Sequence, residues 1–202
     1  MAYHGYIPWV DEFTRELEKP AILEIGIHSG QTLFPLVQRY TARKQNFRYV
    51  GVDVLLRDYV KVIIMYMNLK EGAQEIKLFE SNSLEFLPTC VQKFNVILLD
   101  GDHNYHTVSR ELPYLADLLL PGGFILCDDY EGKYSEKDQY FSEVEECKDI
   151  EDLVKREDVD PSKQGVRTAV NEFCEENPEW EKATFDHKAE PVILFRKGEI
   201  EW

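Results

Sequence analysis

Aspartates stand at the ends of three predicted β-strands, and these residues are the ones best placed to do chemistry. One strand ends in Asp53, one in Asp100 and one in the pair Asp128 and Asp129. In an open parallel sheet, ligands bind just beyond the carboxyl ends of the strands. Neighbouring strands lie about 5 Å apart, so Asp100 and the Asp128–Asp129 pair can reach one hard divalent cation. Because consecutive strand residues point to opposite faces, both members of the pair contribute only if the strand has already turned there.

A histidine follows one of these strand ends within a few residues. His103 lies in the segment Asp-Gly-Asp-His-Asn-Tyr, which spans 100–105. A histidine in this place can accept a proton near neutral pH, so His103 is a candidate general base. The structural alternative is a histidine at a helix start that bonds to Asp102 or to the backbone.

A glycine-containing turn follows the first predicted strand. The apolar run 21–25 leads into the pattern Glu24-x-Gly26-x-x-x-Gly30 and then into a helical pattern. This order predicts a strand, a tight turn and a helix, a layout in which the backbone can approach a nucleotide-like ligand. The pattern is not the Gly-x-Gly-x-x-Gly of dinucleotide-binding proteins, and the Glu24 carboxylate suits a cationic or hydroxyl-rich ligand better than a pyrophosphate. Asp53 follows at the end of the next strand, where an acid commonly binds ribose hydroxyls; the alternative is a cap for the next helix.

Strands and helices alternate along most of the chain. This order predicts an α/β fold with a parallel sheet covered on both faces. Two final strands separated by a short turn predict an antiparallel hairpin at the end of the sheet. The predicted strands are 21–25, 46–53, 75–80, 94–100, 124–129, 183–187 and 191–196, and the predicted helices are 8–19, 30–43, 57–70, 83–90, 105–119 and 165–173.

An acidic segment interrupts this alternation after the fifth strand. Residues 131–160 carry twelve acidic and five basic side chains, a net charge of −7, and almost no aliphatic clusters. We expect an excursion from the core, with a helix near 141–156, that acts as a lid or remains a solvated surface loop. The whole chain, 1–202, is then one domain with an acidic insertion at 131–164.

Composition limits the classes of partner. The 202 residues suffice for one domain with a sizeable core, and the net charge of −15 opposes nucleic acids and anionic membranes. No apolar run reaches the roughly 20 residues of a membrane span, and the first residues lack a signal-peptide pattern. The four cysteines form no Cys-x-x-Cys pair, which favours reduced thiols and a cytoplasmic location. Homo-oligomerisation stays open, because the aromatic residues Tyr3, Tyr6 and Trp9 are suited either to a subunit contact or to an acceptor pocket.

From 21 to 196 the sequence resembles class I S-adenosylmethionine-dependent methyltransferases. The turn after the first strand, the acid Asp53, the Ser-Asn-Ser segment 81–83 and the Pro-Gly-Gly segment 121–123 follow one another in the order of that family. The resemblance implies a doubly wound, Rossmann-like sheet of seven mostly parallel strands in the order 3-2-1-4-5-7-6.

A narrower resemblance is to metal-dependent small-molecule O-methyltransferases. It rests on the Asp-Gly-Asp-His-x-Tyr motif at 100–105, on Asp-Asp-Tyr at 128–130 and on Gly-Val-Arg-x-Ala-Val-x-Glu-Phe at 165–173. Members of this group methylate catechols, phenylpropanoid thioesters and macrolide sugars. The sugar type fits best, because the catechol type has Asn where Asp129 stands and the phenylpropanoid type has Lys where His103 stands. Many members have Asp where this chain has Asn82.

The resemblance also implies a role for each site residue. A Mg²⁺ ion would be held by Asp100, Asp128 and Asp129, with His103 as the general base for a small-molecule acceptor hydroxyl. The S-adenosylmethionine contacts would be Glu24, Gly26, Ser29 and Gly30 at the methionine and ribose, Asp53 at the ribose hydroxyls, Asn82 and Ser83 at the adenine, and Asp100.

Three other functions remain open. The first is metal-free transfer to nitrogen, with the aspartates as polar lining only. The second is a non-catalytic subunit that binds S-adenosylmethionine and docks its acidic insertion on a basic protein. The third is a nicotinamide-dependent oxidoreductase, against which the missing third glycine and Glu24 argue.

Overall fold

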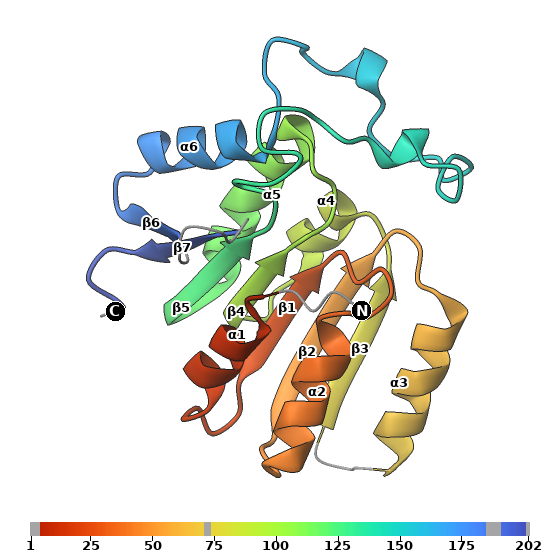
Figure 1. Ribbon diagram of the computed structural model, residues 1–202, viewed down its shortest axis with the longest axis vertical. Coiled ribbons are helices and arrows are strands. Elements are labelled where there is room, and N and C mark those ends of the chain that lie inside the picture. The colour runs from red at the N-terminus through yellow and green to blue at the C-terminus, as the bar shows by residue number, and fades with distance from the viewer. Residues whose placement is uncertain (1–4, 71–73, 185–190, 201–202) are drawn as a thin grey trace.

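The computed structural model describes residues 5–70, 74–184 and 191–200, and a seven-stranded sheet forms its centre (Figure 1). The strand order β3-β2-β1-β4-β5-β7-β6 confirms the predicted order. The first five strands are parallel, and β7 runs antiparallel to both β5 and β6. The strands are β1 (Ala21–Ile25), β2 (Phe47–Asp53), β3 (Gln74–Glu80), β4 (Phe94–Leu99), β5 (Leu119–Cys127), β6 (Trp180–Thr184) and β7 (Val192–Arg196).

In the described part of the chain, six α-helices cover the two faces of the sheet. The side chains of β1 alternate between two buried clusters, with Leu23 in one and Ile22 in the other, as the period of a strand requires. The first cluster packs against α4, α5 and α6, and the second packs against α1, α2 and α3. The helices are α1 (Ile7–Thr14), α2 (Leu33–Ala42), α3 (Asp58–Lys70), α4 (Ser83–Phe86), α5 (Tyr105–Leu118) and α6 (Val166–Glu176).

Several predicted boundaries were wrong, among them one end each of α1, β5 and β6. Helix α1 ends at Thr14 rather than at 19. The Thr14 hydroxyl donates to the Val10 carbonyl over 2.7 Å at this end of the helix. Strand β5 begins at Leu119 and includes the Pro-Gly-Gly segment that was predicted to precede it. Strand β6 begins at Trp180 rather than at 183; the predicted residues 185–187 lie outside the described part of the chain.

The acidic insertion contains no α-helix, so the helix predicted near 141–156 was wrong. Its regular structure is limited to two short 3₁₀ turns, Phe141–Glu143 and Arg156–Asp158. Acidic residues at helical spacing, such as Glu145 and Asp149, would repel one another in an α-helix. The segment instead crosses above the carboxyl ends of the strands, as the upper part of Figure 1 shows.

Asp138 fixes the base of the insertion. Its Oδ1 accepts the Tyr105 amide over 2.9 Å and the Gly165 amide over 2.7 Å, and its Oδ2 accepts the Tyr140 hydroxyl over 2.7 Å. One carboxylate thereby joins the beginning of α5, the end of the insertion and the turn between them.

Within the described residues, no helix has the length and apolarity that a membrane span requires.

Candidate active site

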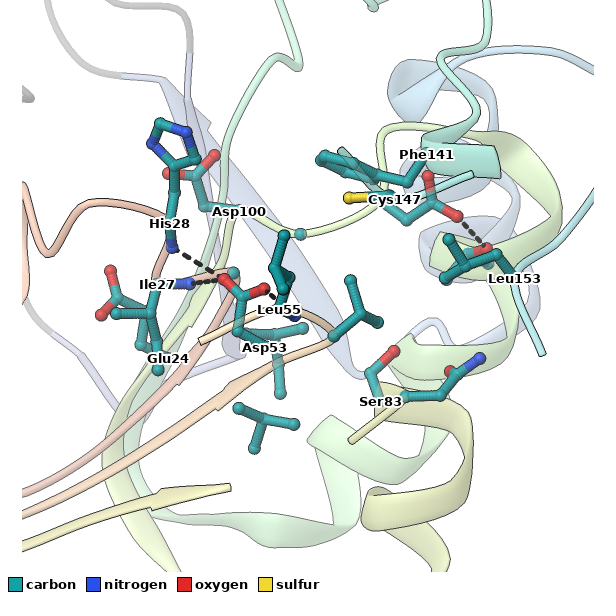
Figure 2. Close-up of a pocket in the computed structure, with 18 of the residues that line it drawn as sticks. Glu24, Ile27, His28, Asp53, Leu55, Ser83, Asp100, Phe141, Cys147 and Leu153 are labelled. Atoms are coloured by element: carbon teal, nitrogen blue, oxygen red, sulfur yellow. Dashed lines mark hydrogen bonds between the residues drawn. The ribbon is translucent and has the colours of Figure 1, made fainter. Parts of the chain in front are cut away.

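A cavity of about 310 Å³ lies beyond the carboxyl ends of β1, β2 and β4 (Figure 2). The loops after β1, β2, β3 and β4 form its body, and the acidic insertion forms one wall. Of the predicted donor-binding residues, six line it, whereas Ser29 and Gly30 lie outside the lining. The six are Glu24, Gly26, Asp53, Asn82, Ser83 and Asp100.

Gly26 lets the first loop pass directly beside the end of β4. Its φ is +88°, and a Cβ atom there would lie 2.0 Å from the carbonyl oxygen of Asp100. The Asp100 amide donates to the Ile25 carbonyl over 2.9 Å, which holds the two strand ends together. A side chain at this position would therefore push apart the two strands that frame the cavity.

The Asp53 carboxylate holds the glycine-containing loop in place. Its Oδ2 accepts the amides of Ile27 over 2.8 Å and His28 over 2.7 Å, and its Oδ1 accepts the Leu55 amide over 2.9 Å (Figure 2). A carboxylate offers roughly four acceptor sites, so three bonds leave about one for a ligand. Asp53 thus ties the loops after β1 and β2 together, besides facing the cavity.

Glu24 is a buried carboxyl rather than an exposed charge. It is 1% exposed and accepts a hydrogen bond from the Tyr49 hydroxyl. Burial raises the pKa of Glu24 to about 8, so the group is largely protonated at neutral pH. The expected repulsion of a phosphate by an ionised Glu24 is therefore weak in this structure.

Asn82 is engaged on both sides of its side-chain amide. Its Oδ1 accepts the Leu84 amide over 3.0 Å and caps α4, while its Nδ2 donates to the Asp152 carbonyl over 2.8 Å. The predicted adenine contact of Asn82 is thus accompanied by a structural function, because this residue ties the insertion to the loop after β3.

His103 lies between two carboxylates. Its Nε2 is 3.6 Å from Oδ1 of Asp100, and its Nδ1 is 3.4 Å from Oδ2 of Asp129. The Tyr134 ring stacks on the imidazole, with ring centroids 5.5 Å apart. Burial lowers the pKa of His103 and outweighs the opposing effect of Asp129, which favours the neutral form that a base requires.

The chain has already turned at Asp128 and Asp129. This turn is what the two side chains need in order to reach the same ligand. Strand β5 ends at Cys127, and Asp129 has φ of +57°. Asp100 contacts Asp128, and burial followed by the Asp128 charge raises the pKa of Asp100 well above its ordinary value. A carboxyl that lies beside a second carboxylate in this way is chemically suited to a cation, which relieves the repulsion between the two.

The described side chains do not surround a common metal position. No group of three or more His, Cys, Asp or Glu residues in the described ranges is arranged to hold a metal ion. The geometry gives the reason: the imidazole of His103 separates Asp100 from Asp129. The donor chemistry fits a hard cation, but convergence of all three aspartates requires this imidazole to move.

Two parts of the site were not predicted. Asp102 lines the cavity and accepts the Thr107 hydroxyl over 2.9 Å, and burial raises the pKa of Asp102 to about 6. The insertion contributes an apolar wall, whose spacing of three residues from 141 to 147 was the one available signal. The wall consists of Phe141, Val144, Cys147, Leu153 and Val154.

Of the aromatic residues near the N-terminus, Tyr6 is buried in the core and Trp9 is partly buried against it. The Tyr6 hydroxyl lies 3.2 Å from the Thr32 hydroxyl, below the glycine-containing loop. Trp9 packs against Phe13 and Phe124, with ring centroids 5.9 and 4.5 Å away. Neither Tyr6 nor Trp9 lines the cavity, and Tyr3 lies outside the described residues.

Comparisons with known proteins identify a family and several similar folds. The profile of the methyltransferase domain family matches residues 23–130, and no curated protein matches the chain in sequence. The fold resembles the Podospora anserina methyltransferase PaMTH1, solved with S-adenosylhomocysteine (SAH): 18% identity, TM-score 0.58, over 98% of this chain and 80% of that one.

Two further solved structures share the fold. MycE, a methyltransferase of mycinamycin biosynthesis solved with Mg and SAH, is 15% identical with a TM-score of 0.58, over 97% of this chain and 52% of that one. This chain therefore spans about half the length of MycE. A putative caffeoyl-CoA O-methyltransferase from Staphylococcus aureus is 14% identical with a TM-score of 0.51, over 98% of this chain and 85% of that one.

Proposed function

Because the chain belongs to the methyltransferase domain family, we propose that it transfers a methyl group from S-adenosylmethionine to a hydroxyl group of a small molecule. The observation that carries the proposal is the position of His103. This residue lines the cavity and lies between Asp100 and Asp129. The net charge of −15 makes a nucleic-acid acceptor unfavourable.

The donor would occupy the cavity beyond β1 and β2. The residues that would hold it are Glu24, Gly26, Asp53, Asn82, Ser83 and Asp100, while Ser29 and Gly30 shape the loop. S-adenosylmethionine supplies an electrophilic methyl group when bound. The carboxyl groups of Asp53 and Asp100 suit the hydroxyls and positive charge of such a donor, and the role of the protein is mainly to position the reactants.

His103 would remove the proton from the acceptor hydroxyl. Burial keeps its imidazole neutral at neutral pH, so a lone pair is available. The Asp129 carboxylate, 3.4 Å from Nδ1, would stabilise the imidazolium that forms. This division of work resembles a base held and oriented by an adjacent acid.

A divalent metal is part of the proposal. Asp100, Asp128 and Asp129 would hold Mg²⁺ after the His103 imidazole has moved from between Asp100 and Asp129. The bound ion would lower the pKa of the acceptor hydroxyl. The contact between Asp100 and Asp128 supports this set, because a cation relieves the repulsion between two adjacent carboxyls. MycE was solved with Mg, which supports the class of ion.

The insertion would act as a lid over the donor. Its apolar wall faces the cavity, and two tethers hold it there: the Arg57–Glu146 ion pair and the bond from Asn82 to the Asp152 carbonyl. Such a wall excludes water from the reacting groups. The lid would therefore cover the donor.

Metal-free transfer to nitrogen is the second candidate. It is favoured by the imidazole of His103, which keeps Asp100 and Asp129 apart. Neutral His103 could then accept the proton that an ammonium acceptor loses before or during attack.

An SAH-release assay separates these functions. Panels of small hydroxyl and amine acceptors are incubated with S-adenosylmethionine, with Mg²⁺ or with a chelator. The proposal expects turnover of hydroxyl acceptors that falls at least tenfold with the chelator and with His103→Gln. Turnover of amines that survives the chelator supports the second candidate instead.

A further inference from the structure

Helix α3 exposes a row of large apolar side chains. Five of the eight large apolar residues that are exposed in the described part of the chain lie on this helix. Their positions 59, 62, 63 and 66 follow the i, i+3, i+4, i+7 spacing of a helix-packing stripe, with 65 beside it. The five are Tyr59 (49% exposed), Val62 (59%), Ile63 (39%), Met65 (62%) and Tyr66 (55%).

The helix is apolar on two sides. Val60 and Ile64 are 0% and 5% exposed and pack on the sheet, so the buried side of α3 is already accounted for. The exposed row lies on another side, at the β3 edge of the sheet (Figure 1). A helix that is apolar nearly all round is normally buried on all sides, which indicates that this one packs against a second element.

A groove adjoins the exposed row. Its volume is about 550 Å³, and its lining is apolar except for Gln38 and Thr41 of α2. The apolar residues are Ile63 and Met67 of α3 and Phe34 and Ala42 of α2. The row and the groove together form one mostly apolar surface that spans α2 and α3. Projecting side chains of a partner helix can enter such a groove.

The charges near this surface are paired within the chain. Nζ of Lys61 lies 2.5 Å from Oε2 of Glu80 and 3.9 Å from Oδ1 of Asp58. Asp58 is the single acidic residue in the sequence of α3 and lies beside Lys61, so this helix offers no acidic row to a basic partner, despite the net charge of −15. For the same reason a second copy of the chain meets little like charge at this place.

We propose that this surface is the interface of a homodimer, in which α3 of one copy packs against α3 of a second copy about a twofold axis. The spacing of the row calls for a helix as the partner. Among the helices in the described ranges, α3 alone carries more than one exposed large apolar side chain, since Tyr114 stands alone on α5. A twofold interface joins the same surface of both copies, so the exposed row on α3 of one copy packs against the identical row on α3 of the other.

The size of the surface suits such a pairing. Five half-exposed large side chains present an apolar area on the order of 500 Å². A stable interface buries about 800 Å² per partner, and the groove and the polar rim supply the remainder.

Net charge gives the dimer a distinctive salt dependence. Two chains of net charge −15 repel each other over the distance that low salt leaves unscreened. Added salt screens this repulsion and does not weaken an apolar contact. The dimer therefore becomes tighter as salt rises, whereas docking on a basic protein would become weaker.

Sedimentation velocity over a series of protein concentrations and salt concentrations tests the proposal on the full chain. We expect a concentration-dependent dimer that tightens with salt. Val62→Glu and, separately, Met65→Glu weaken it by at least about tenfold, because each places a charge in the apolar contact twice. The matched control is Val91→Glu, since Val91 is 87% exposed and lies away from α3.

A circular dichroism melt of each variant shows that it is folded; both substituted residues on α3 are more than half exposed. A wild-type chain that stays monomeric at every concentration and salt overturns the proposal. So does a dimer that persists in both α3 variants, or one that loosens as salt rises. None of these results depends on methyl transfer, so the dimer and the enzymatic proposal stand or fall separately.

Discussion

Nδ1 of His103 lies 3.4 Å from Oδ2 of Asp129, a residue whose φ of +57° shows that the chain has left β5. This relationship connects the turn after one strand to the base that follows another. The Asp129 charge favours the imidazolium, while burial favours the neutral ring and has the larger effect on the pKa of His103. The balance between these two effects sets the pH range in which the base works.

The first prediction concerns that balance. We expect the pKa of His103 to lie below its ordinary value, and Asp129→Asn to lower it further by removing a negative charge that favours protonation. Two-dimensional NMR of the histidine rings during a pH titration measures both values. Asp58→Asn is the control, because its fully exposed carboxylate lies on α3, and it should leave His103 unchanged. A rise of the pKa in Asp129→Asn would contradict this assignment.

The second prediction concerns the buried carboxyl of Glu24. Its pKa is about 8 in the folded chain against an ordinary 4.5, so the folded state binds more protons than the unfolded state between these values. Stability therefore falls as pH rises through this window. Glu24→Gln removes the contribution, so its stability relative to wild type increases by about 3 kcal/mol from pH 5 to pH 8.

Urea unfolding at several pH values measures this difference. The comparison with wild type cancels Glu111, whose pKa is also raised to about 8 by burial. A difference that stays constant with pH would show that Glu24 is ionised in the folded chain.

The third prediction concerns Gly26. Gly26→Ala combines a positive φ with a Cβ atom 2.0 Å from the Asp100 carbonyl oxygen, and we expect a loss of about 3 kcal/mol of stability. Gly198→Ala is the matched control: its φ is +75°, but nothing lies within 4 Å of the added atom. The control should lose only about 1 kcal/mol from the backbone conformation. Equal losses in the two variants, measured by urea unfolding, would mean that the close approach at Gly26 is unimportant.

The fourth prediction concerns the lid. Arg57→Ala removes one tether of the insertion, and we expect SAH to bind about threefold more weakly and to dissociate faster. Glu146→Ala should have the same effect, and the double variant should add little. Glu143→Ala is the control, because it breaks the Arg156–Glu143 pair within the insertion and leaves the tethers intact. Stopped-flow measurement of SAH release gives the rates, and release unchanged in Arg57→Ala would contradict the tether.

Much of the fold could be predicted because its signals are local. The apolar run 21–25, the two glycines and the aspartates at the strand ends identify β1, the first loop and the edge at which the cavity lies. Periodicity alone could not find the start of β5, because Pro121 and Gly122 read as a helix stop. The first residues of β5 belong to the sheet because they pair with β4, as Leu119 does with Phe94. Such pairing joins residues that are distant in sequence, so a local pattern does not show it.

The wall and the shared functions of the site residues could not be predicted for the same reason. Phe141 and Leu153 reach the cavity because Asp138, Arg57 and Asn82 hold the insertion from three distant places. No motif records such bonds. Motifs likewise mark Asp53 as a ligand residue without showing that it also accepts three backbone amides.

Calorimetric titration with S-adenosylmethionine tests the central claim most directly. The wild-type chain should bind the donor with micromolar affinity, and Asp53→Ala, which removes the carboxylate that holds the loop, should bind at least about tenfold more weakly. Repeating the titration with Mg²⁺ and with a chelator, in wild type and in Asp100→Ala, should show a separate metal signal that the variant lacks. No heat of donor binding to a folded wild-type chain under any of these conditions would contradict the account.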